Sequence, residues 1–511
     1  MRWTSTEPDT QGRQIGLGDF DHAIFEHLPY IAETGFNAIE LLPVQDSKDT
    51  VNWGYGTRFF FAPDYDMGTP VDLKAFIKKC HQQGIRVLLD VVMNHAKDCP
   101  LQKLAMEWYF LESPSEEERD ADWGGKCFRL QQPRPDDRYL AREFLFGMAR
   151  YWVREYHMDG FRIDEAKGIN NYDFLQEFTE AAWDEHNKVF PDRPFIVIAE
   201  DSARRAAMTQ PTHRGRKVVN AIWDFNYRDE ARRAISDRMF TNWGEPSRRQ
   251  RVEAFISGSE SWNDWNHRFE GGFGDMGQHI IYQTSHDVEK PGEQRLINYL
   301  LCEELSVRGW TDIGYQNIRN VVDGYPGYTE ADAIDALNVA FERARSAYGL
   351  LMCSVGIPMY LAGEQYADTH DLDHTQWRQK MSDVLNSDRR GRPRHLQLET
   401  QVAELIELRK NHSALLRNEI DFFYFHPTFD DNGGERVFAF CRTAGKPLYS
   451  TGQVVVVANL SRRSYPSFIF NDWHWEHCSE HAMSTQGSSA FFSWQHANIP
   501  LLPGQVRVFT T

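Results

Sequence analysis

The stretch Gly160-Phe161-Arg162-Ile163-Asp164 ends a short apolar run with an acidic residue. Two later stretches share this design, Phe195-Ile196-Val197-Ile198-Ala199-Glu200 and Tyr282-Gln283-Thr284-Ser285-His286-Asp287. An apolar run of this length is typical of a buried strand, and a charged residue after it has left the core. In a parallel α/β barrel the C-terminal ends of the strands open into one shared mouth. We therefore expect Asp164, Glu200 and Asp287 to converge on one site.

Converging carboxylates indicate a particular chemistry. Two of them are the minimum for glycoside hydrolysis, one as nucleophile and one as acid/base. The alternative for any single acid is a helix N-cap or an ion-pair partner. Three acids at matching strand ends, two of them close to Arg162 or His286 in the sequence, favour the catalytic interpretation.

Composition limits the possible partners. The chain has 511 residues, a hydrophobic content of 41% and a formal net charge of −18. This charge argues against a nucleic acid or an anionic membrane as partner, because phosphate contacts need clustered Lys and Arg. A neutral substrate fits the charge. The aromatic side chains fill a core, and exposed ones can stack on the flat faces of sugar rings.

The seven cysteines are odd in number and include no Cys-x-x-Cys pair, which indicates a reduced compartment without a disulfide framework or a zinc site. Cys80 and Cys353 fall in helical apolar patterns and are predicted to be core. Residues 1–8 lack the apolar stretch of a signal peptide, and no apolar run is long enough to span a bilayer. We expect a soluble, cytoplasmic protein, provided that Met1 is the natural start.

Residues 1–410 are predicted to form a catalytic (β/α)8 TIM barrel, because short β-rich runs alternate with helical segments. One such helix carries Leu73, Phe76, Ile77 and Cys80, with Asp72 as its N-cap and Gly84 at its end. A closed barrel needs an eighth strand, for which only Met1–Trp3 is available, so that strand is a stub or the natural chain starts further upstream. The seven candidate strands are Ala38–Val44, Val87–Val92, Phe161–Asp164, Phe195–Glu200, Ala221–Phe225, His279–Thr284 and Pro358–Ala362.

Two insertions and a second domain complete the predicted organisation. The barrel is expected to carry loop insertions near 96–140 and 239–276, of a length typical of site-shaping loops. Residues 411–511 are predicted to form an antiparallel β-sandwich domain. Its expected strands are Phe422–Phe425, Val437–Cys441, Val454–Ala458, Phe468–Phe470, Ala490–Ser493 and Val506–Phe509.

Four short segments together resemble the signature regions of the α-amylase clan, glycoside hydrolase family 13, over roughly residues 20–510. The match is specific because the segments agree in order and in role. They are Asp90-Val91-Val92-Met93-Asn94-His95, Gly160–Asp164 with Lys167, Ala199-Glu200-Asp201 and Ser285-His286-Asp287. Taken alone, His95 would be expected to be a hydrogen-bonded core histidine, and the other segments favour a site residue instead.

The resemblance implies a role for each site residue. Asp164 is the expected nucleophile, Glu200 the general acid/base and Asp287 the residue that holds sugar hydroxyls and stabilises the transition state. Arg162 is expected to keep Asp164 ionised and oriented, and Lys167 to line a subsite beyond the cleavage point. His95 and His286 are expected to hydrogen-bond the sugar before the scissile bond, and Tyr55 to be its stacking platform, with a turn aromatic as the alternative for Tyr55.

Within the clan the signals are mixed. The branching-enzyme and trehalohydrolase branch is resembled by three features, Trp53-Gly54-Tyr55, Ser285 and Ala362-Gly363-Glu364-Gln365. Lys167 instead resembles the pattern of the α-amylases. We expect no amino-terminal β-sandwich of the kind that the first branch normally carries, and Gly168 replaces a histidine of calcium-dependent amylases. Asn94 matches a calcium-ligand position, but one amide is a poor cage for a cation that takes six to eight oxygens. We expect no cofactor and no metal, with a structural calcium as the less favoured alternative.

The sequence thus predicts a retaining glycoside hydrolase of the α-amylase type, acting on α-1,4-linked glucans through a covalent glycosyl-enzyme intermediate. The first alternative is a 1,4-α-glucan branching enzyme, a related transglycosylase or a trehalohydrolase-like hydrolase. The second is a non-catalytic barrel scaffold, because fold alone does not prove activity. The α-glucan is the expected partner, and the oligomeric state is left open.

Overall fold

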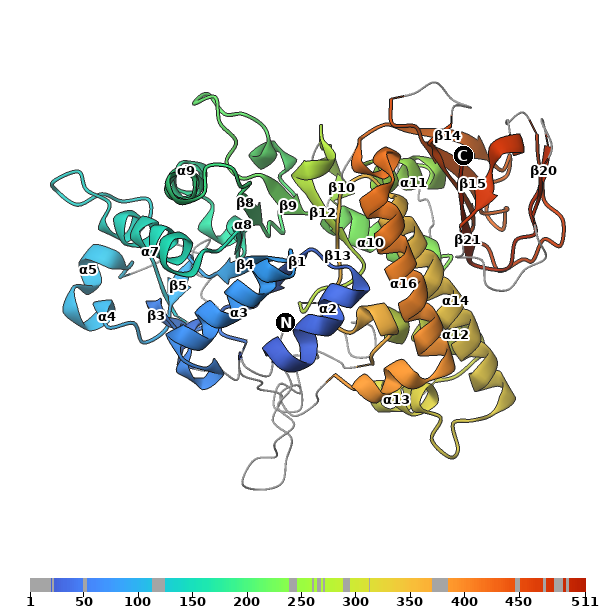
Figure 1. The fold of residues 1–511 in the computed structure, drawn as a ribbon, viewed down its shortest axis with the longest axis horizontal. Coiled ribbons are helices and arrows are strands. Elements are labelled where there is room, and N and C mark those ends of the chain that lie inside the picture. Colours follow the sequence, from blue (N-terminus) through green and yellow to red (C-terminus); the bar gives the residue numbers. More distant parts are fainter. Residues whose placement is uncertain are drawn as a thin grey trace. The chain divides into compact units, whose positions relative to one another are not determined.

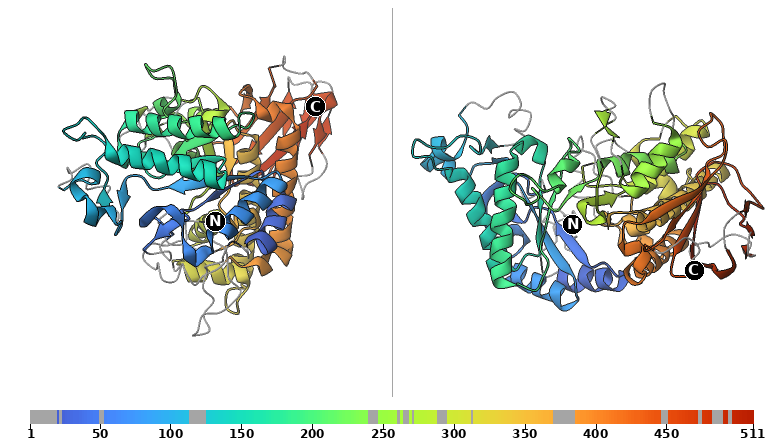
Figure 2. Two further views of the ribbon diagram at one scale, coloured as in Figure 1. Left: turned by 60° about the vertical axis from the view of Figure 1, so that its left-hand side comes forward. Right: turned by 90° about the horizontal axis from the view of Figure 1, so that it is seen from above.

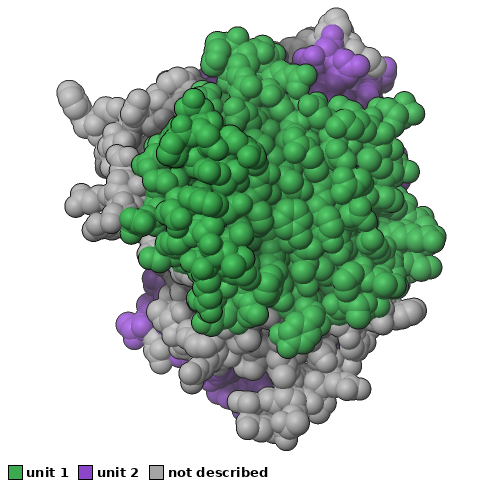
Figure 3. Space-filling model, turned by 90° about the vertical axis from the view of Figure 1, so that its left-hand side faces the viewer, with its two compact units in different colours: residues 1–223, 377–384 green, residues 224–376, 385–511 purple. Residues whose placement is uncertain are grey.

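A computed structural model provides the structure of the chain. It describes residues 20, 23–48, 53–112, 125–238, 246–259, 262–263, 268–269, 272–287, 295–311, 313–369, 385–445, 451–471, 475–481, 490–492 and 496–511. The chain divides into two compact units, residues 1–223 with 377–384, and residues 224–376 with 385–511 (Figure 3). Each unit is described by itself below.

The first unit is built on five parallel strands in the order β1-β4-β7-β8-β9 (Figure 1). They are β1 Ala38–Leu41, β4 Arg86–Val91, β7 Gly160–Ile163, β8 Ile196–Ala199 and β9 Ala221–Trp223. The strands are short and almost wholly buried, which is expected of strands that helices cover. All five coincide with strands predicted from the sequence, with ends that differ by a few residues.

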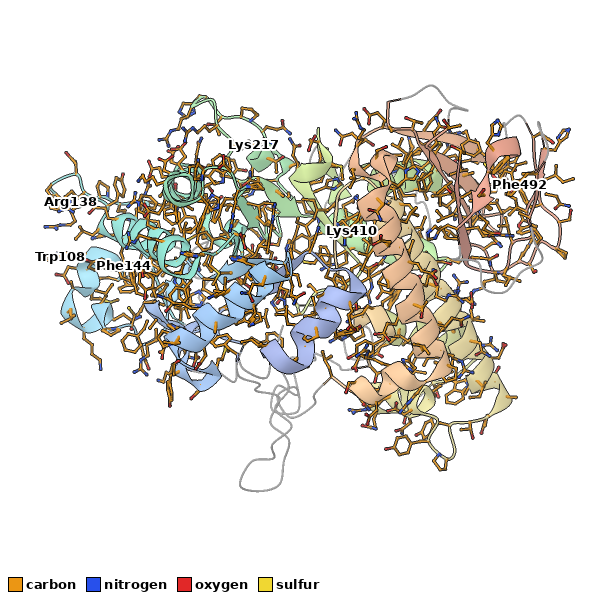
Figure 4. All side chains as sticks on the ribbon, viewed as in Figure 1. Trp108, Arg138, Phe144, Lys217, Lys410 and Phe492 are labelled. Carbon is orange, nitrogen blue, oxygen red and sulfur yellow. The ribbon has the colours of Figure 1, made fainter. Side chains whose placement is uncertain are left out.

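Helices α7 (Leu140–Tyr156) and α9 (Tyr172–Val189) pack against each other beside these strands (Figures 1 and 2). Phe144 of α7 packs edge-on against Tyr109 with ring centroids 6.0 Å apart, and it is labelled in Figure 4. The remaining helices and strands of the unit are α2 Leu28–Thr34, α3 Pro70–Gln82, α4 Leu101–Leu104, α5 Met106–Tyr109, α8 Ala166–Ile169, β2 Gln45–Ser47, β3 Thr57–Pro63, β5 His95–Ala96 and β6 Lys126–Cys127.

The predicted start of α3 was wrong by three residues. Thr69, rather than Asp72, is the N-cap, and Pro70 is the first helical residue. The Thr69 hydroxyl accepts the Asp72 N–H at 3.3 Å, and the Asp72 carboxylate accepts the Thr69 N–H at 2.8 Å. Two orphan donors are satisfied in this capping box, whereas Asp72 as N-cap would have left Pro70 outside the helix it is suited to begin. The helix ends before Gly84, as predicted.

The second unit contains the parallel pair β12 (His279–Tyr282) and β13 (Ile357–Met359), both predicted as strands. Its helices follow the same alternation of strand and helix. They are α10 Phe225–Ile235, α11 Arg248–Ser257, α12 Leu296–Val307, α13 Tyr315–Asp323, α14 Ala331–Cys353 and α16 Pro393–Asn411. The short strands β10 Trp262–Asn263 and β11 Arg268–Phe269 pair with each other.

The C-terminal part of this unit consists of two antiparallel sheets, ordered β14-β15-β16-β21-β18 and β17-β20-β19. Trp475 is fully buried among the side chains of both sheets, stacked on Phe492 (labelled in Figure 4) with ring centroids 5.9 Å apart. The strands are β14 Ile420–Phe425, β15 Val437–Arg442, β16 Val454–Asn459, β17 Ile469–Asn471, β18 Ser479–Glu480, β19 Phe491–Phe492, β20 His496–Asn498 and β21 Gln505–Thr510. The six predicted strands are present, and β18 and β20 were missed.

Other expectations meet the structure as follows. Cys80 and Cys353 are fully buried, which confirms the prediction that they are core. The expected first strand at Met1–Trp3 and most of the insertion near 239–276 lie outside the described residues. Within the described part of the chain, no helix combines the length and the apolar character needed to cross a membrane. The boundary expected at residue 410 stays a prediction.

Candidate active site

The guanidinium of Arg162 is the centre of a carboxylate cluster in the first unit. Its Nη1 donates to both oxygens of Asp90, at 2.9 and 2.8 Å, and to Oδ1 of Asp164 at 2.9 Å. Its Nη2 donates to Oε2 of Glu200 at 2.7 Å. Arg162 and Asp90 are fully buried, and Asp164 and Glu200 are each less than a tenth exposed. One buried cation therefore orients three carboxylates.

Strand register explains why these residues meet. Asp90 on β4 pairs with Arg162 on β7, and Arg162 pairs with Ile198 on β8. Side chains two residues apart in a strand point to the same face. Asp164 therefore continues the face of Arg162, and Glu200 continues the face of Ile198. The structure brings Asp164 and Glu200 together at the ends of neighbouring strands, where the sequence predicted them.

The cluster contains several buried carboxyl groups around one guanidinium, and this imbalance shifts the pKa values of its members. Burial opposes the charge of Arg162, but Asp90 and Glu200 outweigh it, so the pKa of Arg162 lies well above its ordinary value. Burial raises the pKa of Asp90 against the opposing charge of Arg162. Glu40 on β1 belongs to the same cluster, and burial raises its pKa to about 7 while Arg162 lowers it and Asp90 raises it. The Glu40 carboxyl of this cluster is thus partly protonated near neutral pH.

Tyr55 and His95 lie on one side of this cluster. The Tyr55 hydroxyl donates to Oδ2 of Asp90 at 2.6 Å, and a ring nitrogen of His95 lies 3.1 Å from the Tyr55 carbonyl oxygen. Gly54 adopts φ +85, and a Cβ there would meet the Pro43 carbonyl oxygen at 2.2 Å. The turn therefore requires glycine next to Tyr55, and its conformation directs the half-buried ring toward the acids.

Glu165 is a site residue that the sequence analysis did not single out. It is nine-tenths buried and left-handed, with φ 33, a conformation that is strained for a residue with a side chain. Its N–H donates to Oε2 of Glu200 at 3.1 Å, and its own carboxyl accepts from the Ser202 hydroxyl at 2.8 Å. Burial, followed by the charge of Glu200, raises the pKa of Glu165 to about 7. The signal in the sequence was a second acid directly after Asp164.

The other predicted residues are placed as follows. Lys167 is exposed on the short helix α8, three residues after Asp164. His286 and Asp287 belong to the second unit, just after β12, with a His286 ring nitrogen 3.2 Å from Oδ1 of Asp287. The Asp287 N–H donates to the Ser285 hydroxyl at 3.3 Å. The structure thus groups Tyr55, His95, Arg162, Asp164 and Glu200 within one unit, while His286 and Asp287 pair within the other.

The described residues contain no group of three or more His, Cys, Asp or Glu side chains arranged to hold a metal ion. Asn94, the candidate calcium ligand, is nine-tenths buried, and its backbone carbonyl oxygen accepts the Phe128 N–H at 3.0 Å. The expectations on cofactors and calcium stay predictions.

Comparison with solved structures identifies the fold. An α-amylase from Anoxybacillus matches with a TM-score of 0.68 at 18% identity, over 99% of this chain and 95% of that one. A pullulanase from Paenibacillus barengoltzii, solved with maltohexaose and α-cyclodextrin, matches with a TM-score of 0.67 at 19% identity, over 96% of this chain and 73% of that one. The predicted fold class, a (β/α)8 barrel with a C-terminal antiparallel β-sandwich, is confirmed.

Comparison of sequences identifies the relationship. Residues 5–139 match the family described as alpha amylase, catalytic domain. The 1,4-alpha-glucan branching enzyme GlgB of Methylobacillus flagellatus is 29% identical over 241 residues, 43% of this chain and 32% of that enzyme. The GlgB enzyme of Bacillus cereus strain B4264 is 30% identical over 235 residues, 42% of this chain and 34% of that enzyme. Residues 5–139 are thus similar to the α-amylase catalytic domain, in agreement with the resemblance of the motifs, and the alignments with the branching enzymes cover about a third of the length of those enzymes.

Proposed function

We propose that this protein is an α-glucan-active enzyme of the α-amylase clan, which cleaves α-1,4-linked glucans with retention through a covalent glycosyl-enzyme intermediate. The observation that carries the proposal is the shared guanidinium of Arg162, which binds Asp164 and Glu200 through different nitrogens. Two carboxylates held together out of water are what the double displacement requires.

The hydrogen bonds support this proposed mechanism. Arg162 donates to Oδ1 of Asp164 and so keeps this carboxylate oriented for its proposed attack on the anomeric carbon. Arg162 and the Glu165 N–H both donate to Oε2 of Glu200, so the catalytic proton belongs on Oε1. A protonated carboxyl can accept at one oxygen and donate from the other. Glu200 can therefore protonate the leaving oxygen from Oε1 while its Oε2 stays bound to Arg162.

The second half of the reaction reverses these roles. Once the leaving chain has departed, the ionised Oε1 of Glu200 takes a proton from the incoming acceptor, whose oxygen displaces Asp164 from the sugar. Asp287, His286 and His95 are proposed to hold sugar hydroxyls, and Tyr55 to stack on the ring. The bond from Tyr55 to Asp90 supports this, because it holds the aromatic face still.

Water is the proposed acceptor, which makes the enzyme a hydrolase of the α-amylase type. The exposed Lys167 supports this, since the resemblance assigns this position to a subsite for the leaving chain. Incubation with amylose should release short maltooligosaccharides, so that reducing ends rise as iodine staining falls. Intact protein mass spectrometry with an activated fluoro-sugar should detect a glycosyl adduct that is lost in Asp164→Asn.

The second candidate is transfer to a glucan hydroxyl, as in a branching enzyme. The matches to 1,4-alpha-glucan branching enzymes at 29–31% identity favour it. It predicts loss of iodine staining without new reducing ends, and α-1,6 branch protons by NMR. A protein that changes neither reducing ends nor iodine staining and forms no glycosyl adduct would instead be the non-catalytic scaffold.

A further inference from the structure

A pocket of about 400 Å³ lies in the second unit, and arginine dominates its lining. Four segments contribute to it: the end of α10, the start of α11, the connection between β14 and β15, and the residues that follow β16. Five of its nine lining residues are arginines and one is acidic, in a chain of net charge −18. The lining residues are Asp237, Arg238, Arg248, Gly433, Gly434, Arg436, Ser461, Arg462 and Arg463.

Arg248 and Arg436 are more than nine-tenths buried. Arg248 donates to the Asp430 carbonyl oxygen and, at 2.8 Å, to the side-chain oxygen of Asn432. Arg436 donates to the carbonyl oxygens of Phe429 at 2.7 Å and Asp431 at 2.9 Å. These acceptors are neutral oxygens, which satisfy N–H groups of both guanidinium groups.

One N–H donor of Arg436 is also unsatisfied among the described residues. Its buried Nε forms an ion pair with Asp237 Oδ1 at 3.9 Å, a distance beyond hydrogen-bond range, and has no hydrogen-bond partner within the described part of the chain. Burial, and next the charge of Arg248, lowers the pKa of Arg436. A buried donor without an acceptor is unfavourable, and an anionic oxygen in the pocket would satisfy it.

Three more arginines line the pocket in ion pairs. Arg238 binds Glu303 at 2.6 Å, Arg462 binds Glu304 at 2.8 Å, and Arg463 binds Glu435. The side chains of Arg238 and Arg463 are more than half exposed, so these pairs are weak and can exchange partners. Asp237 is the one acid in the lining, and burial raises the pKa of its carboxyl while the neighbouring arginines lower it.

The glycines make room beside these cations. Gly433 adopts φ +71, and a Cβ on Gly434 would meet the Thr428 carbonyl oxygen at 1.8 Å. Neither position offers a side chain that could fill the pocket. A ligand can therefore combine an anionic group against the arginines with a larger body over this backbone.

We propose that this pocket binds a phosphate ester, a small phosphorylated metabolite whose phosphate contacts Arg248 and Arg436 and whose remaining part lies over Gly433 and Gly434. Phosphate suits this lining because guanidinium groups bind its oxygens in a bidentate manner. The proposal is independent of the glycosidase chemistry, since it involves none of the residues assigned to that site.

Isothermal titration calorimetry on the full chain tests the proposed phosphate-ester binding. The ligands are two phosphate esters, glucose 1-phosphate and ADP, and two comparison anions, inorganic phosphate and citrate. We expect at least one ester to bind with a Kd below about 1 mM, and more tightly than inorganic phosphate or citrate. Arg462→Gln combined with Arg463→Gln should weaken that ester roughly tenfold or more. These side chains line the pocket without supporting backbone carbonyls, so the variant should remain folded, as its thermal midpoint would verify. Arg417→Gln, an exposed arginine of the same unit outside the pocket, is the matched control.

Three outcomes would overturn the proposal: no binding of either ester at about 10 mM, inorganic phosphate or citrate binding as tightly as the esters, or equal ester binding by the double variant and the Arg417→Gln control. Arg436→Gln gives a second measurement. If it folds, it should lose ester binding, and retention of full affinity would contradict the proposed contact.

Discussion

Glu165→Gln is predicted to stabilise the protein at alkaline pH and to leave its stability unchanged in acid. The Glu165 carboxyl is buried beside Glu200, and its pKa is raised from 4.5 to about 7. Glutamine has the same shape, and its oxygen can still accept the bond from the Ser202 hydroxyl. The substitution therefore removes the titrating proton while keeping the hydrogen bond.

The sign and size follow from linkage. A carboxyl whose pKa is raised by folding is neutral in both states below about pH 4.5, where it has no effect on the free energy of unfolding. As the pH rises toward and through 7, the unfolded chain gives up the proton more readily than the folded chain, and stability is lost. A pKa raised from 4.5 to about 7 corresponds to about 3 kcal/mol at a pH where the group is ionised. Because Glu165 and Glu200 are coupled, we expect a measured gain of about 1–3 kcal/mol.

The assay compares urea denaturation of wild type and variant at about pH 5 and about pH 8. The gain should be largest at the higher pH and fall to about a quarter of that size at the lower one, where the unfolded carboxyl is already partly ionised. Glu107→Gln, an exposed carboxyl of the same unit, is the control and should show no difference at either pH. An equal effect of Glu165→Gln at both values, or destabilisation at the higher one, would refute the reasoning.

Three further predictions concern the proposed chemistry. Asp164→Asn should abolish turnover of amylose with an unchanged thermal midpoint, because an amide cannot form the glycosyl ester. The control is Asp173→Asn, a substitution of an exposed acid on α9, and wild-type rates from Asp164→Asn would remove Asp164 from the nucleophile role. Glu200→Gln should lose most activity on amylose but form the intermediate readily from a glycosyl fluoride, whose leaving group needs no proton; equal losses on both substrates in stopped-flow measurements would contradict the assignment. Excess EDTA should change the thermal midpoint little, and a fall of more than a few degrees that calcium reverses would show that a structural ion is present.

The sequence was sufficient for the strands and for part of the site. Each of the seven predicted apolar runs contains a strand, with ends that differ by a few residues, because a buried parallel strand has to be apolar on both faces. The contact between Arg162 and Asp164 follows from their spacing of two on one strand, and the acid at the end of β8 follows from the same alternation. By contrast, β18 has two residues, too few for any periodic pattern.

Two local features could not be predicted from the sequence pattern alone, the N-cap of α3 and the backbone conformation of Glu165. Thr69 and Asp72 are both good N-cap residues, and the capping box uses both of them, one from each end. Glu165 is an ordinary acid in the sequence. Its left-handed backbone, its burial and its bond to Glu200 arise only when α8 turns away from the end of β7.

What the sequence by itself determined is therefore the set of elements and the residues at their ends, since periodicity and strand alternation act over a few residues. What only the tertiary structure decided is which distant groups share a low-dielectric volume. Asp90, Arg162 and Glu200 come from three strands, and Glu40 joins them from a fourth. The arginine pocket likewise unites residues from 237 to 463. Burial and Coulomb forces depend on distance in space, which is why neither the raised pKa of Glu40 nor the grouping of these arginines follows from spacing along the chain.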